Sequence, residues 1–88
     1  MSDTEAAIRA ICTDLAAMLI AKNEAYGDSA LQPLGIFSKG SAEELIRARI
    51  DDKLNRIRNR PDAFGEDAID DLLGYLVLLK IARGGVTP

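Results

Sequence analysis

Three aspartates stand at the head of the most apolar stretch of this sequence. Asp67, Asp70 and Asp71 precede residues 72–81, where almost every position is apolar. On a helix, residues 67 and 71 share one face, and residue 70 also lies within reach of residue 67. Carboxylates beside a dry interior are normally paired, used as caps or bound to a cation. The pattern therefore predicts either a site for a hard cation such as Mg²⁺ or acids that stabilise a helix N-terminus.

The choice between these alternatives depends on where each acid lies in the helix. Glu66 and Asp67 come first and suit the stabilisation of a helix N-terminus. Asp70 and Asp71 are expected one turn further on, where the helix dipole no longer favours a negative charge. For these two residues both alternatives stay open. As a metal site, the cluster would use Asp67 and Asp71.

A second group of candidates lies in the strongly charged segment 41–59. Asp51 and Asp52 are further candidate metal ligands. Because guanidinium and ammonium groups bind phosphates well, the candidate phosphate-binding residues of this segment are Arg47, Lys53 and Arg56. The alternative is a solvated helix held by ion pairs between residues three or four apart. Lys53 fits that alternative less well, because it borders the apolar stripe.

A third group of candidates stands at the end of the predicted first helix. Helical spacing brings Lys22 and Tyr26 onto its apolar face, with Asn23 on the flank. There Lys22 could point at a ligand phosphate or base, and Tyr26 could stack on a base. The structural alternatives are a lysine whose stem is buried while its ammonium reaches water, and a tyrosine that closes the core.

Three helices are expected to position these residues. Apolar residues recur at three- and four-residue spacing over 3–25 and 41–59, and a third helix is predicted to start between 62 and 66 and to end at 84–85. No strand-like alternation is present, so the sequence predicts an all-α fold. The apolar stripe of the first helix is Ile8, Ile11, Cys12, Leu15, Met18 and Leu19, and the expected core stripe of the second helix is Ile46, Ile50, Leu54 and Ile57.

The segment 28–40 is predicted to be a loop, because it contains Pro33, Gly35 and Gly40. It is too apolar for a solvated linker. We therefore expect it to pack over other residues, either as a structural cover or as a lid over a ligand.

Length and composition indicate one small domain over residues 1–88. Hydrophobic residues make up 48% of the 88 residues and aromatic residues only 5%, which predicts an aliphatic core. The third helix leaves no polar face, so we expect a homo-oligomer that buries what one copy cannot. The net charge of -3 argues against a protein that binds nucleic acids in general or an anionic membrane.

The cysteine and histidine counts exclude several mechanisms. The sequence has no histidine, so it offers no Ser-His or Cys-His nucleophile pair and no ordinary zinc site. A metal should then be a hard one with oxygen ligands, such as Mg²⁺. The single cysteine, Cys12, cannot form an internal disulfide, which fits a reducing cytoplasm. The first residues show neither a signal-peptide pattern nor a membrane span.

Three segments together resemble a known family. They are KNEAYGDSA at 22–30, LIRARIDDKLNRIRN at 45–59 and EDAIDDLLGYLVLL at 66–79. The combination is similar to the nucleotide modification associated domain of phage and bacterial proteins. That family resembles the all-α nucleoside triphosphate pyrophosphatases of the MazG and dimeric dUTPase superfamily.

The resemblance implies Mg²⁺-dependent cleavage of a nucleoside triphosphate between its α- and β-phosphates. By position, Asp67 and Asp71 match the acidic pair of the metal-binding helix, and Asp51 and Asp52 lie on the helix that should face it. The residues that match the family's entry motif are Lys22, Asn23, Tyr26, Gly27 and Asp28. Arg47 and Ala68 stand where the superfamily often carries acids. Nucleotide binding is therefore better supported than cleavage.

Three hypotheses for function follow from these patterns. The chain is a small Mg²⁺-dependent nucleotide pyrophosphohydrolase, a nucleotide-binding protein without turnover, or a helical module that only associates through its apolar third helix. DNA binding through the segment 41–59 is a weaker fourth hypothesis, because acids interrupt its basic residues.

Overall fold

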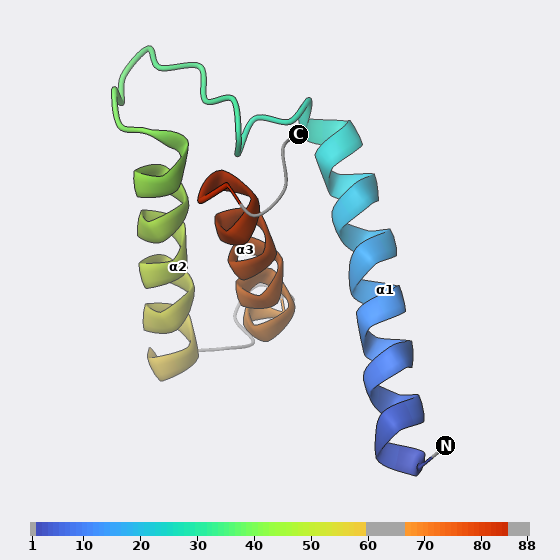
Figure 1. Cartoon of the computed structure of the whole chain (residues 1–88). Coiled ribbons are helices and arrows are strands. Elements are labelled where there is room, and N and C mark those ends of the chain that lie inside the picture. The colour runs from blue at the N-terminus through green and yellow to red at the C-terminus, as the bar shows by residue number, and fades with distance from the viewer. Residues whose placement is uncertain (1, 60–66, 85–88) are drawn as a thin grey trace.

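The computed structural model of the protein describes residues 2–59 and 67–84. Over these residues the predicted all-α fold is confirmed, with helices α1 (Asp3–Tyr26), α2 (Ala42–Asn59) and α3 (Ala68–Ala82). Figure 1 shows α3 between the other two helices, and α3 packs mainly on α2 and less extensively on α1. No helix in this part of the chain has the length and hydrophobicity needed to cross a membrane.

The ends of α1 and α2 lie where capping residues occur in the sequence. Ser41 Oγ accepts a hydrogen bond from the Glu44 backbone N–H at 3.1 Å and donates one to the Glu44 carboxylate at 3.3 Å. Ser41 therefore caps α2, as the capping-box pattern predicts, but the Glu44 carboxylate bonds to the Ser41 hydroxyl and not to its backbone N–H. At the end of α1, Gly27 adopts a left-handed conformation with φ of 63°, which glycine tolerates without strain.

The contact between α2 and α3 contains the most deeply buried side chains of the described residues. Ile46 is 2% exposed and Ala68 is 1% exposed. Leu54, which we predicted to lie in the same stripe, is 50% exposed, so that prediction is wrong. The side chain of Lys53 is only 17% exposed. Lys53 follows Ile46 by seven residues and returns to nearly the same angle on the helix, whereas Leu54 lies a further 100° around.

The contact between α1 and α3 depends on a glycine. A Cβ atom added to Gly74 would lie 2.6 Å from Leu19 Cδ2, which is much closer than carbon atoms approach in proteins. Glycine in the middle of a helix costs about 1 kcal/mol relative to alanine. At this position it lets Leu19 of α1 approach the backbone of α3.

We expect the substitution Gly74→Leu to separate α1 from α3 and to lower the free energy of unfolding by about 1–3 kcal/mol, the usual cost of overpacking. Gly74→Ala should be nearly neutral, because the gain in helix propensity of about 1 kcal/mol offsets a small shift of the Leu19 side chain. Urea unfolding measures both values. Adding Leu19→Ala to Gly74→Leu should recover part of the loss, and unchanged stability in Gly74→Leu would contradict this contact.

The apolar stripe of α1 is covered only along its second half. Leu15, Met18 and Leu19 are half-buried, whereas Ile8 and Ile11 are 57% and 60% exposed and Cys12 is also exposed. The isolated chain therefore covers only part of this stripe. The physical reason is length: α1 has 24 residues and α3 has 15, and Figure 1 shows the first half of α1 running past the ends of the other helices.

The isolated chain also leaves part of α3 exposed, and burial of this part against a second copy stays a prediction. Ile69, Leu76 and Val77 of α3 are 58%, 42% and 38% exposed. Three helices cannot surround one another completely, so one apolar face of α3 stays open to solvent.

Candidate functional site

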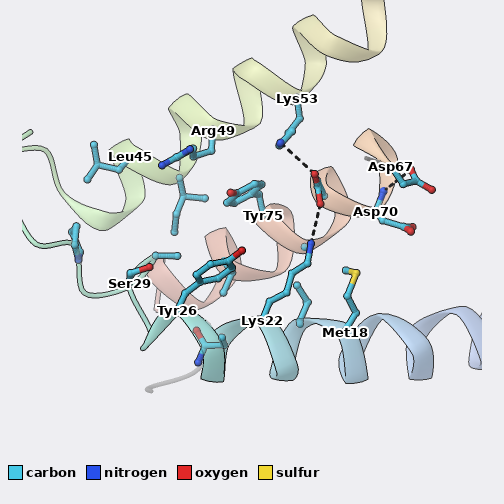
Figure 2. Close-up of a pocket in the computed structure, with 18 of the residues that line it drawn as sticks. Met18, Lys22, Tyr26, Ser29, Leu45, Arg49, Lys53, Asp67, Asp70 and Tyr75 are labelled. Atoms are coloured by element: carbon cyan, nitrogen blue, oxygen red, sulfur yellow. Dashed lines mark hydrogen bonds and ion pairs between the residues drawn. The ribbon is translucent and has the colours of Figure 1, made fainter. Parts of the chain in front are cut away.

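A pocket of about 840 Å³ lies between the three helices and is lined partly by the loop after α1. Its size falls within the range of about 300–1,000 Å³ that small-molecule sites occupy. Figure 2 shows side chains from α1, α2 and α3 pointing into this space. From the loop, the residues that line it are Ser29, Ala30, Pro33 and Leu34. The loop thus forms one wall of the pocket, but the expectation that its apolar side chains pack over other residues is wrong for Leu34, Ile36 and Phe37, which are 84%, 61% and 101% exposed. Its role as a lid stays a prediction.

An ion bridge across the pocket joins all three helices. The Asp71 carboxylate of α3 contacts Lys22 of α1 and Lys53 of α2, each through an Nζ–O distance of 3.2 Å (Figure 2). The side chains of Asp71 and Lys53 are both 17% exposed, whereas that of Lys22 is 49% exposed. One carboxylate therefore holds two ammonium groups that come from helices far apart in the sequence.

The two lysines set the protonation of Asp71. Burial of the carboxylate on its own raises the pKa, but the hydrogen bonds and positive charges of Lys22 and Lys53 outweigh that effect. The net result is that the pKa of Asp71 lies below its usual value. Asp71 is therefore a carboxylate at neutral pH and stays one in moderately acidic solution.

The lowered pKa predicts how stability depends on pH. An unfolded aspartate has a pKa of about 3.9. Because the folded value is lower, the stabilisation from Asp71 is complete above about pH 4 and is lost as the pH falls through the folded value. We expect urea unfolding to show a steeper loss of stability below this pH in the native chain than in the Asp71→Asn variant. Identical acid dependence in the two proteins would contradict the assignment.

Asp67 stabilises the N-terminus of α3, which is one of the two roles that the sequence left open for it. Its Oδ1 atom accepts hydrogen bonds from the backbone N–H groups of Ile69 at 2.9 Å and Asp70 at 3.2 Å, so Asp67 is the N-cap of α3. The helix consequently begins at Ala68, and the expected start between 62 and 66 falls outside the described residues. Asp70 and Asp71 lie in the first turn rather than the second, which corrects our expectation and gives both a favourable dipole interaction.

The acids of the described residues do not form a ready-made cage for a cation. Within residues 2–59 and 67–84, no group of three or more acid or cysteine side chains is arranged to hold a metal ion. Asp67, Asp70 and Asp71 all line the pocket, but Asp67 caps the helix and Asp71 bridges the lysines. Any metal here would need oxygen ligands from a bound molecule as well.

Six of the predicted site residues line the pocket: Lys22, Asn23, Tyr26, Lys53, Asp67 and Asp71. The predicted residues that do not line it are Asp28, Arg47, Asp51, Asp52 and Arg56. Arg47 contacts Glu43 at 3.3 Å on the same helix, and Asp51 and Asp52 are exposed. The cause is the rotation of α2, which turns Lys53 toward α3 and the two neighbouring aspartates toward solvent.

The sequence did not identify one charged and one aromatic lining residue as site residues. Arg49 lies one turn before Lys53 on α2, and Tyr75 lies one turn after Asp71 on α3. Four-residue spacing from a correctly predicted neighbour would have found both. Arg49 was overlooked because it is one of several arginines in a charged helix, and Tyr75 because it sits inside an apolar run.

The pocket thus combines three cations, three acids and two tyrosines. Comparisons with protein-family models, curated proteins and solved structures found no match. The family resemblance therefore stays a prediction from the sequence. The pocket lining includes Lys22, Asn23, Tyr26, Lys53 and Asp71.

Proposed function

We propose that this pocket binds a nucleotide. The observation that carries the proposal is the meeting of three cationic side chains, Lys22, Arg49 and Lys53, with two aromatic ones, Tyr26 and Tyr75, in one cavity of about 840 Å³. Phosphates need cations, and a base needs a flat apolar partner. Few other small molecules require both in one site.

The cations supply the phosphate end of the site. Arg49 offers a planar guanidinium suited to two phosphate oxygens, and the lysine ammonium groups act as point charges. Lys22 and Lys53 are already held near each other by Asp71. Their positions are therefore organised before the ligand arrives, which reduces the entropy lost on binding.

The tyrosines supply the base end of the site. Figure 2 shows Tyr26 of α1 and Tyr75 of α3 reaching into the pocket from neighbouring helices. Tyr26 is 69% exposed. Stacking a base on it would cover apolar ring surface that now faces water, and such stacking contributes about 1–3 kcal/mol.

The proposal includes Mg²⁺ bound together with the phosphates of the nucleotide. This cation commonly binds through one or two carboxylates together with substrate phosphates and water, rather than in an all-protein cage. Asp70 and Asp71 line the same pocket as the cations and are the carboxylates that would hold it. When bound, the ion would neutralise phosphate charge that would otherwise face these acids.

Calorimetry tests the proposal directly. Canonical and modified nucleoside triphosphates are titrated into the protein, once with Mg²⁺ and once with a chelator. Inorganic triphosphate and a free nucleoside serve as controls, because each represents one half of the ligand. We expect a nucleotide to bind more tightly than either half, and Mg²⁺ to strengthen binding. Pyrophosphate measured in the same samples shows whether a bound triphosphate is also hydrolysed.

The results separate the three hypotheses of function. Binding with pyrophosphate release supports a pyrophosphohydrolase, and binding without release supports a nucleotide-binding protein. No heat from any nucleotide, with a helical circular dichroism spectrum, would overturn the proposal and leave an interaction module. We place the activity in a reducing compartment such as the cytoplasm, because the only cysteine, Cys12, is free and exposed.

A further inference from the structure

The isolated chain exposes more surface than its mass explains. Its accessible surface is 6756 Å², about 1,700 Å² more than the roughly 5,050 Å² expected for a folded monomer of 9.5 kDa. The radius of gyration is 14.4 Å, against about 12 Å expected for 88 residues. One partner of a stable complex buries about 800 Å² in a standard interface. The excess is thus large enough for an extensive contact.

An apolar stripe on α1 contributes to this exposed surface. Ile8, Ile11, Cys12 and Leu15 lie on the face of α1 that, further along, contacts α3 through Leu19. We call these four residues the open stripe. Ile8 and Ile11 are 57% and 60% exposed, and Figure 1 shows this half of α1 projecting beyond both other helices. The open stripe continues an internal contact past the end of α3, and only Leu15, at its edge, is half-buried.

We propose that the open stripe pairs with the same stripe of a second copy, as an antiparallel helix pair. In one register of this pair, Ile8 of each copy lies opposite Leu15 of the other copy, and Ile11 lies opposite Cys12. The stripe is therefore complementary to itself. Every apolar residue then meets an apolar residue across a two-fold axis, as a closed dimer requires.

Charge favours the antiparallel over the parallel arrangement. The first turn of α1 carries Asp3 and Glu5. A parallel pair would bring the two acidic ends together, whereas an antiparallel pair places them at opposite ends of the contact. The interface lies along the half of α1 that precedes the pocket, and the proposal does not depend on nucleotide binding.

Two isoleucines with equal exposure provide a matched test. Ile11 and Ile20 are both 60% exposed on α1, and their nine-residue separation puts them on opposite sides of the helix. We expect sedimentation or light scattering to give the native chain a mass twice that of the 9.5 kDa monomer. Ile11→Glu should halve this mass, and Ile20→Glu should leave it unchanged. Circular dichroism confirms that both variants fold.

Cys12 gives a second measurement, because it is the only cysteine and lies in the open stripe. Its thiol should react slowly with a maleimide in concentrated native protein, faster on dilution, and fast at all concentrations in Ile11→Glu. A native chain that is monomeric at its highest soluble concentration would overturn the proposal. Equal loss of the dimer in Ile11→Glu and Ile20→Glu, or a thiol reactivity independent of concentration, would also overturn it.

Discussion

Replacing Asp71 with asparagine is expected to lower the free energy of unfolding by about 2 kcal/mol, the scale of hydrogen bonds to charged groups in a partly buried ion pair. The substitution keeps the shape of the side chain and removes its charge. Lys22 and Lys53 then lose the carboxylate that they share, and the ammonium group of Lys53 stays in a position where its side chain is only 17% exposed. Urea unfolding at neutral pH measures the change.

The neighbouring residue is the matched control. Asp70 has the same side chain, lies in the same first turn of α3 and is exposed. Its dipole interaction is similar, so Asp70→Asn removes the same charge without breaking the bridge. We expect a change within about 0.5 kcal/mol, the usual range for surface substitutions. Equal effects of the two variants would show that the bridge adds nothing to stability.

A double-mutant cycle isolates the contact between α2 and α3. Combining Asp71→Asn with Lys53→Met removes both charges, and Met retains most of the apolar stem. Because an unsatisfied partly buried charge is costly while an apolar pair is not, the double variant should be more stable than the sum of the single effects predicts. Strict additivity would mean that Lys53 and Asp71 do not interact in solution.

The elements of the fold were predictable because their signals are local. The capping-box pattern at Ser41 and Glu44 and the glycine after Tyr26 each act within a few residues, and both helix ends lie where they indicate. The candidate site was predictable in part. Lys22, Tyr26 and Lys53 line the pocket as expected.

The rest depended on information that a single helix does not contain. The sequence shows that Asp51, Asp52 and Lys53 are adjacent, but only the packing of α2 on α3 decides which of them faces inward. The contact between Gly74 and Leu19 likewise joins residues from two helices, and no local pattern predicts it. The open stripe poses the same difficulty, because an apolar face indicates burial without indicating whether its partner belongs to the same chain.

The second large effect concerns ligand affinity. If the proposed nucleotide site is correct, Arg49→Gln should weaken nucleotide binding about 10- to 100-fold, which corresponds to one or two charge-assisted hydrogen bonds. Arg49 is the informative cation because Lys22 and Lys53 also hold Asp71, so changing them alters stability together with affinity. Calorimetry with the tightest-binding nucleotide of the panel gives the ratio of dissociation constants.

Arg47 is the matched control on the same helix. It lies two residues before Arg49, carries the same charge, contacts Glu43 at 3.3 Å and does not line the pocket. Arg47→Gln therefore changes the net charge by the same amount, and nucleotide affinity should change less than twofold. Similar losses in both variants would indicate a general charge effect and would count against a phosphate contact at Arg49.

Inorganic triphosphate identifies which end of the ligand Arg49 contacts. If the guanidinium binds phosphate oxygens, Arg49→Gln should weaken the binding of inorganic triphosphate and of the nucleotide by the same factor. The difference in affinity between the variant and the native protein should then shrink as the salt concentration is raised. If only the nucleotide loses affinity, Arg49 contacts the base or ribose instead of the phosphates. The phosphate end would then depend on Lys22 and Lys53 alone, which line the same pocket.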